Sequence, residues 1–248
     1  MLPRLSCWAF LFAICAATGL AAALPCVTDT LFNYEALGAT GCTIGALTVK
    51  NFVYNSLPGN TVTILDTAIT VTPTVGPGGL DLNFFSNNFA TISTTDTAKY
   101  LLAYTWDPGD IRSLDDILTA NSPVFPGFAQ ISTLACLDAA FSGSSCGTST
   151  ASVVVNDNGL ILNSPSSVVF SPSVGTLGIR NTIELDANGA SSEFKSFDNQ
   201  IALPEPSTAI PCLFLSVLLF RRSRRGVRTR ARRIATHGDA RPPVYTGR

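Results

Sequence analysis

Histidine is almost absent from this 248-residue sequence, whose single histidine is His237, near the carboxy-terminal end. A Ser-His-Asp or Cys-His catalytic arrangement is therefore excluded from residues 26–200, and so is a zinc site with histidine ligands. A phosphate-binding loop is missing as well, because "GPGG" at Gly76–Gly79 lacks the lysine and the strand-to-helix setting that such a loop needs. We interpret this stretch as a turn.

Basic residues are scarce in the middle of the chain. Residues 26–200 hold five Lys and Arg against fifteen Asp and Glu, a net charge of 5 − 15 = −10. Because phosphate contacts depend on Lys and Arg, we do not expect nucleic acid as a partner. Residues 221–248 hold ten arginines and one acid, a net charge of 10 − 1 = +9. This cluster follows an apolar run, which favours its retention on the cytoplasmic side of a membrane.

Long helical periodicity and fixed-period repeats are also lacking, and short β-branched or aromatic runs separated by turn residues take their place. Examples are "LTVKNFVYN", "TVTILDTAITVT" and "KYLLAYTW". "NDNG" at Asn156–Gly159 predicts a hairpin turn, and "DANG" at Asp186–Gly189 repeats the signal. Residues 111–120, "IRSLDDILTA", are the one segment for which we predict a short helix. The sequence predicts an all-β, single β-sandwich or jelly-roll-like domain over residues 24–202.

The amino terminus has the features of a secretory signal peptide. Arg4 precedes an apolar stretch that ends in small residues, and Ala21 and Ala23 fit the preferred cleavage pattern. We predict a signal peptide over residues 1–23 with cleavage after Ala23; the alternative is an uncleaved membrane anchor.

Export changes what the cysteines mean. Three of the seven lie in the two apolar end segments, and four remain in the domain: Cys26, Cys42, Cys136 and Cys146. An even number in an oxidising compartment indicates two disulfides, with three possible pairings. The short loops favour Cys26–Cys42 and Cys136–Cys146. A metal site is the alternative, but no histidine lies nearby and no CxxC motif occurs, so we expect neither metal nor cofactor.

The carboxy-terminal region combines three parts in a fixed order. The motif is Pro204, Glu205, Pro206, Ser207 and Thr208, followed by a short apolar run at 209–220 and the basic cluster Arg221, Arg222, Arg224 and Arg225. This succession over residues 203–225 resembles the PEP-CTERM sorting signal of exported proteins of Gram-negative bacteria. The segment 33–55, with Gly-Cys-x-x-Gly at 41–45, is similar to the opening of other such proteins.

The resemblance implies a route rather than an activity. It implies export across the inner membrane, transient anchoring there by the apolar run, and processing near the motif by the membrane enzyme exosortase. The destination would be the cell surface or the extracellular matrix, where exopolysaccharide is a further possible partner. Residues 226–248 form an Arg-rich tail without apolar periodicity, which we expect to be disordered.

Carboxylates are the remaining catalytic resource, and four of them cluster beside two aromatic residues. The residues are Asp107, Asp110, Asp115 and Asp116, with Tyr104 and Trp106. A glycosidase needs two carboxylates flanking a sugar ring. The simpler interpretation is a turn at "WDPGD" followed by early helix acids that the helix dipole favours. The Asp and Asn oxygens of "NDNG" and "DANG" suit calcium, but both loops are more simply turns.

The sequence therefore supports one principal hypothesis and two alternatives. The principal one is an exported, non-enzymatic protein of the cell surface or extracellular matrix, routed by a PEP-CTERM signal, with no catalytic residues. The first alternative is a polysaccharide-binding module in which Tyr104 and Trp106 stack on sugars, an argument from fold and family analogy. The second is a carboxylate glycosidase that uses Asp107 and Asp110.

Overall fold

The computed structural model describes residues 23–91, 93–119, 123–141, 146–147 and 149–204. The chain divides into two units, Met1–Pro204 and Glu205–Arg248, and all described residues belong to the first. The predicted signal peptide up to residue 22, the motif from Glu205 onward, the basic cluster and the tail lie outside the described residues. None of the described helices is long and apolar enough to cross a membrane.

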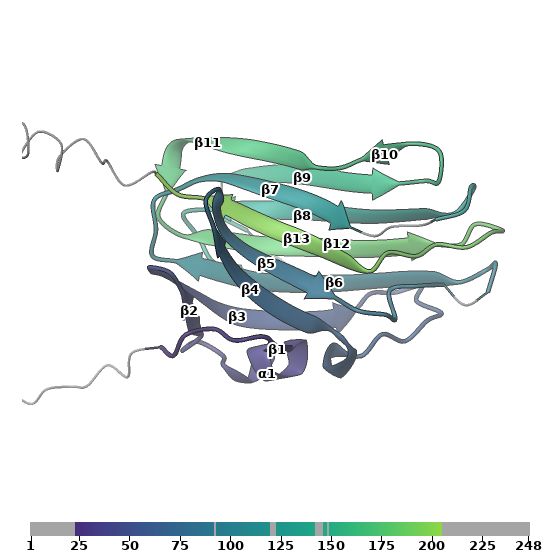
Figure 1. Ribbon diagram of the computed structural model, residues 1–248, viewed down its shortest axis with the longest axis horizontal. Coiled ribbons are helices and arrows are strands. Elements are labelled where there is room, and N and C mark those ends of the chain that lie inside the picture. The colour runs from purple at the N-terminus through teal and green to yellow at the C-terminus, as the bar shows by residue number, and fades with distance from the viewer. Residues whose placement is uncertain (1–22, 92, 120–122, 142–145, 148, 205–248) are drawn as a thin grey trace, which may run out of the picture. The chain divides into compact units, whose positions relative to one another are not determined.

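The described domain is almost entirely β-structure, as predicted, and consists of two antiparallel sheets that form a sandwich (Figure 1). The first sheet has seven strands in the order β10-β9-β8-β12-β6-β3-β2. Their bounds are Leu162–Asn163, Thr150–Asp157, Phe128–Leu137, Leu177–Asp186, Thr97–Asp107, Leu47–Ser56 and Cys42–Ile44.

The second sheet has six strands in the order β1-β4-β5-β13-β7-β11. Their bounds are Asp29–Thr30, Thr70–Gly76, Gly79–Phe85, Ser196–Ala202, Ile111–Thr119 and Ser166–Val174. The last of the described strands, β13, thus lies between β5 and β7, inside the sheet. The described chain begins and ends at the same end of the sandwich, on the left in Figure 1.

The core lies between the sheets because the strands alternate apolar and polar residues. In β5, Leu80, Leu82 and Phe84 are buried, whereas the residues between them are partly exposed. Aromatic rings fill much of the space: Phe84 stacks on Phe197 with centroids 5.0 Å apart, and Phe52 stacks on Tyr104 at 5.1 Å. Each such fully buried side chain stabilises the fold by about 1.5–3 kcal/mol.

The edge of the seven-stranded sheet is covered by the helix α1, Leu31–Ala36. Strand β2 pairs with β3 only as far as Val49, so the rest of β3 has no described partner strand on that side. A Glu35 Oε1 oxygen accepts the Tyr54 N–H at 2.7 Å, and the Gly38 carbonyl accepts the Asn51 N–H at 2.9 Å. These bonds satisfy part of an edge that would otherwise be open to pairing with another chain. A short 3-10 helix, η1, follows at Asp66–Ala68.

Both predicted disulfides are confirmed. Cys26 is bonded to Cys42, and Cys136 is bonded to Cys146. The turn predicted at Gly76–Gly79 joins β4 to β5, and the hairpin predicted at Asn156–Gly159 is formed by β9 and β10.

Two local predictions are wrong. Residues 111–120 were expected to be helical, but Ile111–Thr119 form strand β7, because Leu114, Asp116 and Leu118 alternate toward the core. The polar Asp116 at an apolar position concealed this alternation from the sequence. The "DANG" segment is a turn, but not a hairpin turn: β12 before it and β13 after it belong to different sheets.

Candidate functional site

The four predicted carboxylates do not converge. Asp107, at the end of β6, accepts a hydrogen bond from Lys50 Nζ at 2.7 Å and one from the Thr176 hydroxyl at 2.8 Å. These two bonds lower the pKa of Asp107 below its ordinary value. Asp110 is exposed in the turn before β7. Asp107 is therefore held as one half of an ion pair with Lys50.

Asp115 and Asp116 lie on opposite faces of β7, because successive side chains of a strand alternate. Asp115 is partly exposed on the outer face of the six-stranded sheet, whereas Asp116 is 1% exposed between the sheets. The expectation that both are early helix acids is wrong. The strand prevents the two carboxylates from acting on one substrate.

Tyr104 and Trp106 are core residues, not surface platforms. Their exposed fractions are 1% and 0%, and both point inward from β6. The Tyr104 ring packs against Phe52, Phe84 and Trp106. The hypothesis that these two rings stack on a polysaccharide is wrong as stated, because no sugar can reach them in the folded domain.

The main polar feature is a buried cluster that sequence reasoning missed. Two cross-strand pairs face each other: Asp116 with Asn199 in the six-stranded sheet, and Thr133 with Asn181 in the seven-stranded sheet. Their side chains make four contacts in a closed circuit, which we call the inter-sheet ring, and Tyr104 donates to it from β6. Asparagine at an inward-facing position of two apolar strands was the available signal.

Burial governs the charge of Asp116. Removal from water raises its pKa to about 6, although hydrogen bonds from Thr133 and Asn199 act in the opposite direction. Burial also raises the pKa of Tyr104. The hydrogen bonds of the ring connect the two sheets. Because the ring is closed to solvent, a substrate cannot reach it.

A second group of carboxylates lies on the outer face of the six-stranded sheet. Burial and the neighbouring charge of Asp198 raise the pKa of Asp81 to about 7. The Oδ1 atom of Asp81 has no hydrogen-bond partner among the described residues. Asp198 accepts hydrogen bonds from Asn83 at 2.5 Å and from Thr119 at 3.3 Å, and burial raises its pKa too. Both acids come from adjacent strands, β5 and β13, and lie on the same sheet face.

An open groove of about 420 Å³ lies beside the covered edge of β3, where Tyr54 and Tyr100 stack with centroids 5.1 Å apart. The Tyr100 hydroxyl donates to the Val62 carbonyl at 2.6 Å and accepts the Ile64 N–H at 2.7 Å. The Tyr54 hydroxyl donates to the Ile64 carbonyl at 3.3 Å. The hydroxyl groups are thus engaged in fastening the segment before η1 to the sandwich.

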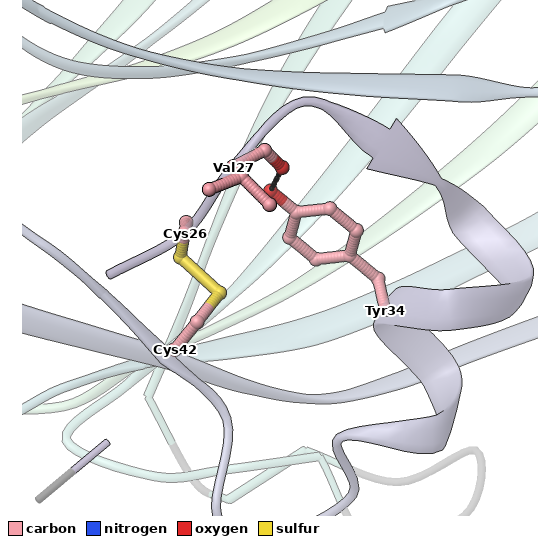
Figure 2. The surroundings of a disulfide bond; sticks show 4 residues. All are labelled: Cys26, Val27, Tyr34 and Cys42. Atoms are coloured by element: carbon pink, nitrogen blue, oxygen red, sulfur yellow. Dashed lines mark hydrogen bonds between the residues drawn. A yellow bond between two sulfur atoms is a disulfide. The ribbon is translucent and has the colours of Figure 1, made fainter. Parts of the chain in front are cut away.

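The amino-terminal disulfide forms a compact cluster with the start of the domain (Figure 2). The Tyr34 hydroxyl donates to the Val27 carbonyl at 2.8 Å, next to the Cys26–Cys42 bond. Cys26 N–H donates to Thr43, and the Thr43 N–H donates back to Leu24. These contacts fix the chain to the sandwich within a few residues of the predicted cleavage point.

The loops considered for calcium use their oxygens internally. The Asp157 Oδ1 atom accepts the Gly159 N–H at 2.7 Å, and the Asn158 Oδ1 atom accepts two further N–H groups of its own turn. The Asp186 Oδ1 atom accepts the Asn188 N–H at 2.9 Å. Within the described ranges, no group of three or more His, Cys, Asp or Glu residues is arranged to hold a metal ion.

Comparisons with known proteins add little. No protein-family model matches the chain, and no curated protein matches it. Among solved structures, the chain is similar to the enzymatically active domain of tailspike protein 4 of bacteriophage CBA120, with 13% sequence identity and a TM-score of 0.29. The match covers 61% of this chain and 19% of that one. A likeness this weak does not bear on function.

Proposed function

We propose that the protein is an exported, non-enzymatic β-sandwich that a PEP-CTERM sorting signal directs to the cell surface or extracellular matrix, with exosortase as its processing partner. The observation that carries the proposal is the pair of disulfides in a domain whose fold ends just before the sorting motif.

The disulfides support an oxidising destination. Cys26–Cys42 and Cys136–Cys146 join residues 16 and 10 positions apart in a domain without a metal-type cysteine motif. Such bonds form and persist outside the cytoplasm and are rare within it. Their presence agrees with the signal-like amino terminus.

The position of the fold relative to the motif supports processing. Strand β13 ends at Ala202, two residues before Pro204, where the motif begins. A cut within or beyond the motif would therefore leave every strand of the sandwich intact. The two prolines disfavour helical residues before them, which favours an extended, accessible segment.

The distribution of polar groups supports a non-enzymatic role. Among the carboxylates with raised pKa values, Asp116 lies in the sealed ring, Asp81 and Asp198 lie on an open sheet face, and Glu35 is bound to the Tyr54 N–H. Asp107 is held in an ion pair. A reproducible hydrolase activity that Asp81→Asn or Asp116→Asn abolished, without loss of folding, would contradict this part of the proposal.

Intact mass spectrometry of the cell-associated protein tests the route, because it measures both ends at once. In a host with a functional exosortase, we expect a chain that begins near Leu24 and lacks the residues after the motif. The double variant Pro204→Ala/Pro206→Ala and an exosortase-deficient strain should both accumulate the unprocessed carboxy terminus. The matched control is Pro58→Ala, at an exposed turn proline. A mature surface form that still contains Arg221–Arg225, or unchanged localisation without exosortase, would overturn the proposal.

A further inference from the structure

The inter-sheet ring has an unusual balance of hydrogen-bond donors and acceptors. The Thr133 oxygen contacts both an Asp116 oxygen and, at 2.7 Å, the Asn181 Oδ1 atom. Asn181 Nδ2 donates to Asn199 Oδ1 at 2.6 Å, and Asn199 Nδ2 donates to the other Asp116 oxygen at 2.7 Å. Tyr104 adds one contact to Asn199, at 2.7 Å, and supplies the proton for it.

Counting protons shows what is missing. Each of the four contacts in the circuit needs one proton, and the Thr133 hydroxyl has one to give. Each of the two asparagine amides supplies one more, which makes three for four contacts when Asp116 is ionised. Rotating either amide moves the gap to another contact but does not fill it, because an amide always presents one oxygen and one nitrogen. A proton on Asp116 completes the circuit.

The ring has no access to a substitute from solvent or from a cation. Its four members are at most 2% exposed. The nearest charged residues of the same strands alternate to the outer faces of the sheets: Asp115, Asp198 and Arg180. Strand β8 contributes no charged residue, and the other titratable group at the ring is Tyr104, on which Asp81 also acts. Among the described residues, the charge that acts on Asp116 is that of Asp115, which disfavours ionisation further.

We propose that Asp116 of the folded protein carries a proton in mildly acidic surroundings and that this proton closes a hydrogen-bond ring between the two sheets, so that the sandwich is more stable there than in neutral surroundings. The device is separate from the sorting signal and does not depend on it. It makes the stability of the domain sensitive to the pH of the compartment that receives it.

The direction in which stability changes with pH follows from the linkage between proton binding and folding. Burial raises the pKa of Asp116 to about 6, above its ordinary value of 3.8. The folded state then binds the proton more tightly than the unfolded state, so the stabilisation is fully present below pH 3.8 and is lost as the pH rises through about 6. A difference of roughly two pKa units corresponds to about a hundredfold in the unfolding equilibrium constant above pH 6.

The test compares the oxidised full chain with Asp116→Asn in urea unfolding between pH 4 and pH 8. The asparagine amide supplies the fourth proton at every pH. We therefore expect the variant to unfold about a hundredfold less readily than the wild type at pH 7.5 and about equally at pH 4. Other raised carboxylates, such as Asp81 and Asp198, remain in both proteins and cancel in the difference. A difference in unfolding free energy between variant and wild type that does not change with pH, or a variant less stable than the wild type at pH 7.5, would overturn the proposal.

A second measurement needs no variant. The side-chain carboxyl carbon of Asp116 can be assigned through its own backbone by triple-resonance NMR and titrated in the wild-type chain. A midpoint near 6 supports the protonated ring, whereas a midpoint at or below the ordinary pKa of 3.8 refutes it. This outcome decides the question even if Asp116→Asn fails to fold.

Thr133→Ser, which retains the hydroxyl, should leave the midpoint near 6, and Thr133→Val should shift it because both ring contacts of the hydroxyl are removed.

Discussion

Removing the Cys26–Cys42 disulfide tests whether the amino-terminal segment is part of the cooperative fold. The bond closes a segment of 16 residues, and the chain-entropy account assigns it about 3 kcal/mol at 25 °C. Cys42 is 4% exposed, so alanine is a better replacement than serine, which would bury a hydroxyl group. With a urea m-value of about 2 kcal/mol/M, Cys26→Ala/Cys42→Ala should unfold at a urea concentration lower by about 1.5 M.

The structure also predicts which part of the domain loses stability when this disulfide is removed. Leu31 and Tyr34 of α1 are 0% and 2% exposed and belong to the main core. The segment should therefore unfold together with the sheets, and amides of α1 should exchange with solvent no faster than those of β3. Cys136→Ala/Cys146→Ala, which opens a segment of 10 residues, is the matched control and should lose a similar amount. A loss below about 1 kcal/mol, or fast exchange confined to α1, would refute this reasoning.

Three further outcomes follow from local geometry. Gly79→Ala should lower the free energy of unfolding by more than about 2 kcal/mol, because φ at Gly79 is +145° and an added Cβ would lie 1.9 Å from a backbone oxygen of β13. The control Gly76→Ala has open space around the added Cβ and should change it by no more than about 0.5 kcal/mol, both measured by thermal unfolding. Asp81→Asn should flatten the decline of wild-type stability between pH 4 and pH 8, since the raised pKa of about 7 means that ionisation opposes folding; an unchanged pH profile would contradict this. Glu35→Ala should cost about 1–2 kcal/mol by leaving the Tyr54 N–H unpaired, whereas Glu35→Gln retains an acceptor and should cost less than half as much.

The sequence predicted those parts of the structure that depend on local chemistry. Turn residues identified the β9–β10 hairpin, and short loop lengths selected the correct disulfide pairs from three possibilities. Strand β7 was misread because one inward position holds Asp116, and helix and strand patterns over ten residues differ by little more than one such position.

Long-range pairing was beyond the sequence. The Asn188 and Gly189 turn gives the chain a reversal, but it does not determine which sheet the next strand joins. In the structure this turn bonds to the loop before β6, with the Gly189 N–H donating to Thr94, and the chain then crosses to the other sheet. For the same reason the inter-sheet ring could not be foreseen: Asp116, Thr133, Asn181 and Asn199 become neighbours only when both sheets are complete.

The central position of β13 sets the order in which the domain can be completed. Without this strand the six-stranded sheet falls into two fragments, β1-β4-β5 and β7-β11, and the ring lacks Asn199. A chain that crosses a membrane amino terminus first releases residues 196–202 last among the described strands. If the protein is exported as proposed, the sandwich therefore remains incomplete until β13 has crossed the membrane, and the sorting signal of residues 203–225 comes directly after it.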